Sequence, residues 1–136
     1  MLRLASAPLL AAISACHYSD HLAIHNDLGE DLEIDYRFEL PVEPRTCDDL
    51  DSRNDEREAG TATIPAGREL CLEGPVTGPG GTYDLLEELS YLQIRSEAGL
   101  CLDSESDADL DALRARFAKG DYRPILIVDP ALCPST

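Results

Sequence analysis

The sequence predicts a mainly β protein, a small antiparallel β-sandwich or barrel with one α-helix in its C-terminal half and two disulfides. Three observations predict this class. Residues 32–40 alternate apolar and polar side chains without a break, which gives a strand one buried face and one wet face. Glycine and proline turns separate short apolar runs along the rest of the chain. Four cysteines are spread through the same region.

The first strands are expected on either side of a turn. Leu22, Ala23 and Ile24 form a brief apolar run, and residues 26–29 (Asn-Asp-Leu-Gly) supply turn chemistry before the alternating strand. We expect Pro41 and Pro44 to end that strand, because proline cannot donate to a β-ladder and restricts the residue before it. Residues 45–60 are highly polar and are expected to form a long exposed loop.

The middle of the chain predicts further short strands. Residues 61–72 predict a strand, a Pro65-Ala66-Gly67 turn and a second strand, whereas Gly74-Pro75 and residues 78–81 interrupt regular structure. Residues 83–94 show both helical and alternating spacing, and we favour a turn or short helix that leads into a strand. A hairpin at residues 98–99 then leads into a strand at residues 100–102.

One helix and one last strand complete the prediction. Ser106, with Asp109 three residues later, is typical of a helix start, and Gly120 is typical of a helix stop. Between them, Leu110, Leu113 and Phe117 share one face. Residues 124–130 form a β-branched apolar run between two prolines, which favours a central or closing strand covered on both faces.

The first 16 residues have the pattern of an export signal. Arg3 supplies a positive charge, residues 4–13 are an apolar run, and Ala15 is a small residue before the expected cleavage site. An apolar run of about ten residues is too short to cross roughly 30 Å of hydrocarbon as a helix. The residues Ile13-Ser14-Ala15-Cys16 resemble the lipobox of bacterial lipoproteins, in which the cysteine is acylated and becomes the first residue after cleavage.

This resemblance implies a signal peptide at residues 1–15, a short lipid-anchored tether at residues 16–20 and a single mainly β domain at residues 21–136. It also implies that lipid chains on Cys16, such as palmitate, hold the protein in the bacterial cell envelope, because several chains anchor a protein stably. His17 follows the acylated cysteine, and by similarity to sorted lipoproteins this favours the outer membrane, with the domain periplasmic or surface-exposed. The alternatives are a plain N-terminal helix and a secretory signal that leaves Cys16 an ordinary thiol.

The charge of the chain restricts its partners. The net charge is −16, and it becomes −17 once Arg3 is removed with the signal, because every acidic residue follows residue 15. A nucleic-acid-binding protein needs a basic surface to neutralise phosphates, so this class is excluded. Anionic headgroups also repel such a surface, and membrane attachment would therefore depend on the lipid. An acidic surface can bind cations, but we favour a role in solubility.

The cysteines support export independently of the first 16 residues. Beyond Cys16 the chain has an even number of them, as expected for two disulfides in an oxidising compartment: Cys47, Cys71, Cys101 and Cys133. Three pairings are possible. We favour Cys47 with Cys71 and Cys101 with Cys133, because neighbouring cysteines close shorter loops. The absence of a Cys-x-x-Cys pair disfavours a zinc site and a redox enzyme.

One acidic stretch has the spacing of a calcium loop. Its alternating candidate ligands are Asp103, Glu105, Asp107 and Asp109. The stretch lacks the glycine and the terminal glutamate of an EF-hand, and acidic residues at these positions also stabilise a helix N-terminus. We therefore expect no metal, and we keep calcium as an alternative.

The histidines are also weak metal candidates. His17, His21 and His25 lie four residues apart, but on a strand this interval spans about 13 Å, which is too far for one ion. We interpret them as surface histidines near the anchor.

No catalytic motif occurs in the chain, and no cofactor is expected. The patterns Gly-x-Ser-x-Gly, Ser-x-x-Lys and His-Glu-x-x-His are absent. We therefore expect a non-enzymatic binding or structural module that presents acidic loops to a protein partner in the envelope. The alternatives are a calcium-responsive binding protein, which would use residues 48–56 or 103–111, and an unrecognised hydrolase.

Overall fold

The computed structural model describes residues 18–47, 56–77, 84–104, 106–119 and 124–133. In these ranges the chain forms eight strands and one helix and is mainly β, as predicted. In chain order they are β1 (Tyr18–Asn26), β2 (Leu32–Thr46), β3 (Arg57–Ile64), β4 (Glu69–Thr77), β5 (Leu89–Ser96), β6 (Gly99–Asp103), α2 (Asp107–Ala115), β7 (Ala118–Lys119) and β8 (Pro124–Val128). Strand β1 thus begins within residues 16–20, which we assigned to the tether.

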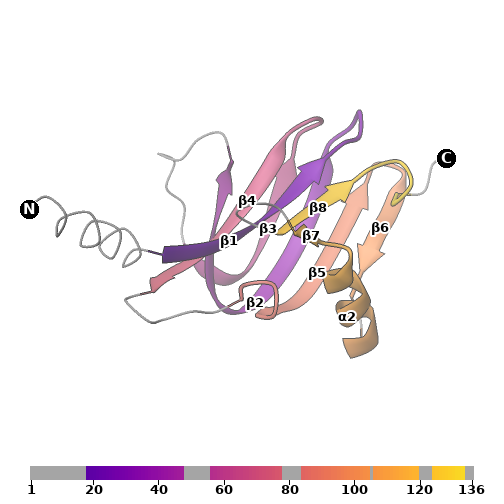
Figure 1. The fold of residues 1–136 in the computed structure, drawn as a ribbon. Coiled ribbons are helices and arrows are strands. Elements are labelled where there is room, and N and C mark those ends of the chain that lie inside the picture. Colours follow the sequence, from indigo (N-terminus) through magenta and orange to yellow (C-terminus); the bar gives the residue numbers. More distant parts are fainter. Residues whose placement is uncertain (1–17, 48–55, 78–83, 105, 120–123, 134–136) are drawn as a thin grey trace, which may run out of the picture.

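The strands form one curled sheet in the order β6-β5-β2-β4-β1-β8-β7, with β3 paired to β2. The sheet is a half-barrel because β2 belongs to both of its halves (Figure 1). The first part of β2 pairs with β3 and β5, and the last four residues of β2 pair with β4. Strands β1 and β8 are parallel, and the other pairs are antiparallel. The expectation of an antiparallel sheet is therefore wrong for that one pair.

The prolines of β2 bend the strand rather than end it. Pro41 has no partner in the described ladders, and the register shifts between Arg37 and Val42. The backbone turns at this point, and β2 then runs back beside β4 (Figure 1). Pro44 is paired with Leu72 on one side only, and a proline is tolerated in such a strand where its missing N–H would point away from the neighbouring strand. The predicted strand end at Pro41 and Pro44 is therefore wrong.

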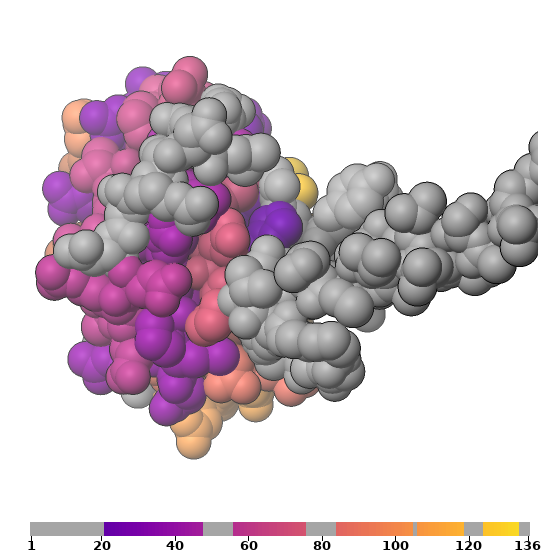
Figure 2. Space-filling view, turned by 90° about the vertical axis from the view of Figure 1, so that its left-hand side faces the viewer, coloured from indigo at the N-terminus to yellow at the C-terminus, as the bar shows by residue number. Residues whose placement is uncertain are grey.

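Two predicted irregular segments also belong to strands. The predicted loop at residues 45–60 is wrong at both ends, because β2 continues to Thr46 and β3 begins at Arg57, while residues 48–55 lie outside the described residues. Figure 2 shows the side of the domain that carries these strands. Gly74 and Pro75 lie inside β4, where the register with β1 shifts between Ser19 and His21. A bulge accommodates a glycine and a proline that a regular ladder would exclude.

The predictions for the second half are confirmed in most places. Residues 85–88 form a turn before β5, and a turn at residues 97–98 leads into β6, which begins at Gly99. The Ser106 side chain accepts a hydrogen bond from the Asp109 N–H at 3.2 Å and caps α2. The helix, however, ends at Ala115, well before Gly120, which lies outside the described residues.

The core fills the inside of the half-barrel. Alternate residues of β2, from Leu32 to Phe38, face it, together with Leu110 and Leu113 of α2 and Phe117 just after the helix. Strand β8 has only one buried face, because Leu126 and Val128 are buried whereas Ile127 is 51% exposed. The expectation that both faces are covered is therefore wrong. This strand lies next to the end of the sheet, where only the two-residue strand β7 follows it.

The cysteines pair as predicted, Cys47 with Cys71 and Cys101 with Cys133. The first disulfide connects two neighbouring strands, because Cys47 follows β2 and Cys71 lies in β4. The second connects β6, at one end of the sheet, with the turn after β8, near the other end (Figure 1). This disulfide therefore joins the two ends of the curled sheet, and no described strand pair joins them with hydrogen bonds. We call this junction the seam.

Asn26, at the end of β1, connects the turn between β1 and β2 with the end of β3. Its side chain is fully buried; the amide donates to the carbonyls of Ile64 (2.9 Å) and Glu30 (2.7 Å), and its oxygen accepts from the Leu28 N–H (2.9 Å). A buried polar group is costly when it loses its partner.

We expect Asn26→Ala to lower the free energy of unfolding by about 2–3 kcal/mol, because the substitution removes three hydrogen bonds and leaves their backbone partners unsatisfied. Denaturant unfolding measures this loss, and Asp27→Ala, at an exposed neighbouring position, is the matched control. An alanine variant as stable as the control would contradict the proposed role of the side chain.

Candidate functional site

Helix α2 presents two different faces. Leu110 and Leu113 point into the core. A second stripe, with the spacing i, i+3, i+4 and i+7, lines a hollow beside the helix and consists of Asp109, Ala112, Leu113 and Arg116. Residues at this spacing lie on one side of a helix. The helix therefore covers the core and forms one wall of a surface groove.

The opposite wall comes from the end of β6. Leu102 and Asp103 complete the groove, which has a volume of about 170 Å³, and we call it the α2–β6 groove. Ser104 holds this strand end in place, because its hydroxyl accepts a hydrogen bond from the Leu92 N–H at 2.8 Å and its own N–H donates to the Leu92 carbonyl. The wall is thus fixed to β5 by a buried side chain.

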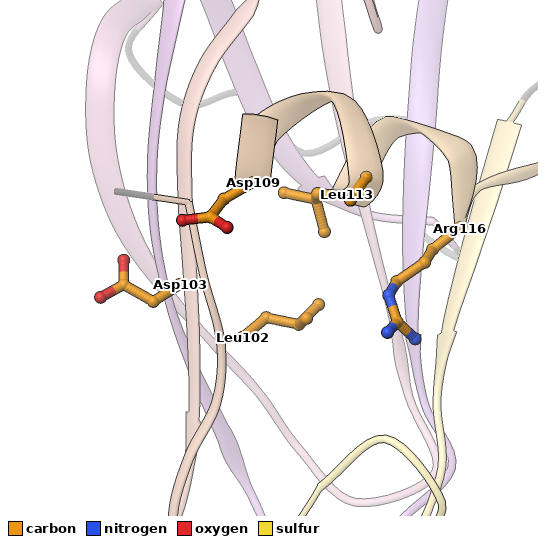
Figure 3. A pocket seen from close by; sticks show the side chains of 6 residues that line it. Leu102, Asp103, Asp109, Leu113 and Arg116 are labelled. Carbon is orange, nitrogen blue, oxygen red and sulfur yellow. The ribbon is translucent and has the colours of Figure 1, made fainter. Parts of the chain in front are cut away.

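Charge is separated along the α2–β6 groove. Asp103 and Asp109 lie at one end, Leu102 and Leu113 occupy the middle, and the guanidinium of Arg116 lies at the other end (Figure 3). Asp109 and Arg116 are seven residues apart on the helix, which corresponds to roughly 10 Å along its axis. The groove therefore has an acidic end, an apolar floor and a basic end.

Two charged groups of the groove have no partner within the described part of the chain. The Oδ1 atom of Asp103 is buried and accepts no hydrogen bond there. The guanidinium of Arg116 forms no ion pair or side-chain hydrogen bond with a described residue. Buried polar atoms in proteins normally have partners, so the described residues leave the Asp103 carboxylate incompletely satisfied.

In each of two further hollows, the arginine side chain is paired with other groups of the domain. In the first, between β2, β3 and β5, Arg95 lies 3.2 Å from both Glu33 and Asp35. In the second, beside α2, Arg114 donates to the carbonyls of Leu86, Glu87 and Leu89 at 2.6–3.1 Å. These arginines stabilise strand pairing and the turn before β5, so both are already engaged within the domain, unlike Arg116 of the α2–β6 groove.

The four acidic residues of the possible calcium loop are separated by the fold. Asp103 ends β6, Asp107 and Asp109 lie in the first turn of α2, and Glu105 lies outside the described residues. Only Asp103 and Asp109 line the α2–β6 groove, whereas Asp107 lines the hollow around Arg114. Within the described ranges, no group of three or more His, Cys, Asp or Glu side chains is placed to hold a metal ion.

Two of the histidines lie on β1, and His17 lies outside the described residues. His21 is opposite Glu73, and His25 is opposite Glu69, in the pairing of β1 with β4. Both side chains are half-buried. The strand places them four residues apart on one face, as the sequence predicts.

No protein-family model, curated protein or solved structure matches this chain. Among the helices in the described ranges, none is long and apolar enough to span a membrane.

The sequence analysis identified Asp103 and Asp109 as candidates but missed Arg116, Ala112 and Leu102. The i, i+3, i+4, i+7 spacing from Asp109 to Arg116 was visible in the sequence. The core stripe of Leu110, Leu113 and Phe117 is sufficient to account for the helix, so this second spacing does not by itself indicate a site. Only the position of β6 shows that the second stripe faces another wall.

Proposed function

We propose that this protein is a lipid-anchored protein of the bacterial cell envelope, and that its disulfide-linked acidic β domain is a non-enzymatic binding module. The observation that carries the proposal is the pairing of all four cysteines beyond Cys16 within the domain. Disulfides of this kind form in oxidising compartments, which supports export. Cys16 then remains the only cysteine outside a pair, and it ends the Ile13-Ser14-Ala15-Cys16 sequence.

The charges of the domain support binding to a protein or a small molecule rather than to nucleic acid or lipid headgroups. The net charge of −16 repels both phosphate backbones and anionic membranes. The anchor would hold the domain at the membrane in spite of this repulsion, because several acyl chains bind far more strongly than one. A protein partner in the envelope would meet an acidic surface.

The test of the anchor is the variant Cys16→Ala in the full-length protein, expressed in a bacterial host that is fed an alkyne fatty acid. We expect labelling to be lost and the protein to leave the membrane fraction, because the thiol that accepts the lipid is gone. The matched control, His17→Ala, should keep both the label and the membrane location.

Two results would contradict the proposal. One is persistent labelling of Cys16→Ala, which would place the lipid elsewhere. The other is an unlabelled wild-type protein whose mass corresponds to the intact chain from Met1. Peptide mapping under non-reducing conditions should also find both disulfides, and free thiols at these four positions in exported protein would remove the support from the cysteines.

A further inference from the structure

We propose that the α2–β6 groove binds a small zwitterion, an ω-aminocarboxylate whose ammonium and carboxylate groups are separated by a short apolar chain. This inference rests on the proposed function, because it names the ligand class of the binding module. The three parts of the groove each match one part of such a ligand.

The ammonium group matches the acidic end. The buried Oδ1 of Asp103 lacks a hydrogen bond in the described structure, and an unsatisfied buried acceptor is energetically costly. An ammonium group carries three donors and a positive charge, so it can pair with the carboxylates of Asp103 and Asp109, which line this end of the groove. A neutral donor could form a hydrogen bond here, but it would not neutralise the negative charges of the two neighbouring carboxylates.

The carboxylate group matches the basic end. Arg116 follows the last residue of α2, and its guanidinium lies at the opposite end of the groove from the two aspartates (Figure 3). No described residue pairs with this guanidinium. The planar fork of an arginine binds a carboxylate through two parallel hydrogen bonds, which fixes the direction of the ligand.

The apolar chain matches the floor and the size of the groove. Leu102, Ala112 and Leu113 offer no hydrogen-bonding side chain between the charged ends. A cavity of about 150 Å³ accommodates a ligand of benzene size, so the groove of about 170 Å³ suits roughly six to nine non-hydrogen atoms. The ligand 6-aminohexanoate has this size, and glycine is too short to reach both ends.

The experiment is a titration of the full-length protein in mild detergent with 6-aminohexanoate, followed by calorimetry and by amide chemical shifts. We expect saturable binding with a dissociation constant of roughly 1 mM, because the groove is open and its charges are partly screened. Hexylamine, hexanoate and glycine should each bind at least about tenfold more weakly, because each lacks one charged group or the length.

Two variants test the charged ends of the groove, and a third tests its floor. Asp103→Asn and Arg116→Gln should each weaken binding by at least about fivefold, while the exposed residues of the matched controls, Asp107→Asn and Arg37→Gln, should leave it unchanged. Ala112→Leu fills the floor without altering any charge and should abolish binding. Thermal unfolding tests whether each variant is folded. If a charge variant does not fold, Ala112→Leu still tests the site.

The proposal is overturned if 6-aminohexanoate does not bind below about 20 mM. It is also overturned if 6-aminohexanoate binds equally well to the wild type and to Arg116→Gln, or if only calcium binds and requires Asp103. The fatty-acid labelling is a separate readout, so the two proposals can fail independently. Labelled protein that does not bind the zwitterion would exclude only the ligand, and unlabelled protein that binds it would exclude only the anchor.

Discussion

Removal of the Cys101–Cys133 disulfide is expected to lower the free energy of unfolding by about 3.5–4 kcal/mol, because the cross-link spans 32 residues and restricts the unfolded chain. The same model predicts about 3.5 kcal/mol for Cys47–Cys71, whose cross-link spans 24 residues. Loop length alone therefore predicts nearly equal losses for the double variants Cys101→Ala/Cys133→Ala and Cys47→Ala/Cys71→Ala. Denaturant unfolding of both variants measures the two losses.

The position of the two disulfides predicts a difference that loop length does not. Cys71 lies in a strand that is hydrogen-bonded to β2, and the backbone N–H of Cys47 also donates to the Glu69 carbonyl, so this junction keeps its ladder without the cross-link. Cys101 lies in β6, which pairs only with β5 among the described strands. Without its disulfide, the seam of the half-barrel can open locally.

Hydrogen exchange of the backbone amides tests this difference. We expect Cys101→Ala/Cys133→Ala to accelerate exchange in β6 and in residues 129–133 beyond the global change, since local opening exposes these amides. Cys47→Ala/Cys71→Ala is the matched control and should leave the exchange of β6 at the rate set by global stability. Equal exchange patterns in both variants would show that the second disulfide does not close the seam.

The second large effect concerns Arg45 on β2. Its guanidinium contacts Glu43 through two bonds of 3.2 and 3.3 Å and lies 3.3 Å from Glu73, which is directly opposite Glu43 in the sheet. The side chains of Arg45 and Glu43 are each only 9% exposed. The hydrogen bonds to Glu43 raise the pKa of Arg45 by more than burial lowers it, so the residue remains charged.

We expect Arg45→Met to cost about 3 kcal/mol, because it leaves two carboxylates on neighbouring strands without the cation between them. Arg95→Met is a matched control. Arg95 also lies 3.2 Å from two carboxylates, but its side chain is 44% exposed, so this loss should stay below about 1 kcal/mol. Both values follow from denaturant unfolding.

A second variant separates the charge from the packing. Replacement of both Arg45 and Glu43 by methionine removes the pair together, and a buried ion pair can often be exchanged for apolar side chains without loss. We expect the double variant to recover at least half of the loss of Arg45→Met. Equal losses in Arg45→Met and Arg95→Met would show that burial does not strengthen this ion pair.

Local pattern was sufficient for much of the fold. The alternation at residues 32–40 predicted the first part of β2, because side chains of a strand point to opposite faces by geometry alone. Ser106 predicted the start of α2 for a similar reason, since its side chain bonds an amide only three residues away. The favoured pairing of the cysteines is also confirmed, although spacing alone left three pairings open.

The remaining features depend on neighbours that are distant in the sequence. Pro41 and Pro75 are accommodated at register shifts and Pro44 by pairing on one side only, and a local pattern does not show which strand lies alongside. Strand β8 pairs with β1 in parallel across about 100 residues, and this pairing sets which of its faces is covered. The α2–β6 groove arises in the same way, because two aspartates and an arginine from separate elements acquire a shared site only once β6 and α2 pack together. Residue type and periodicity thus define each element, and the contacts between elements determine the bends, the seam and the groove.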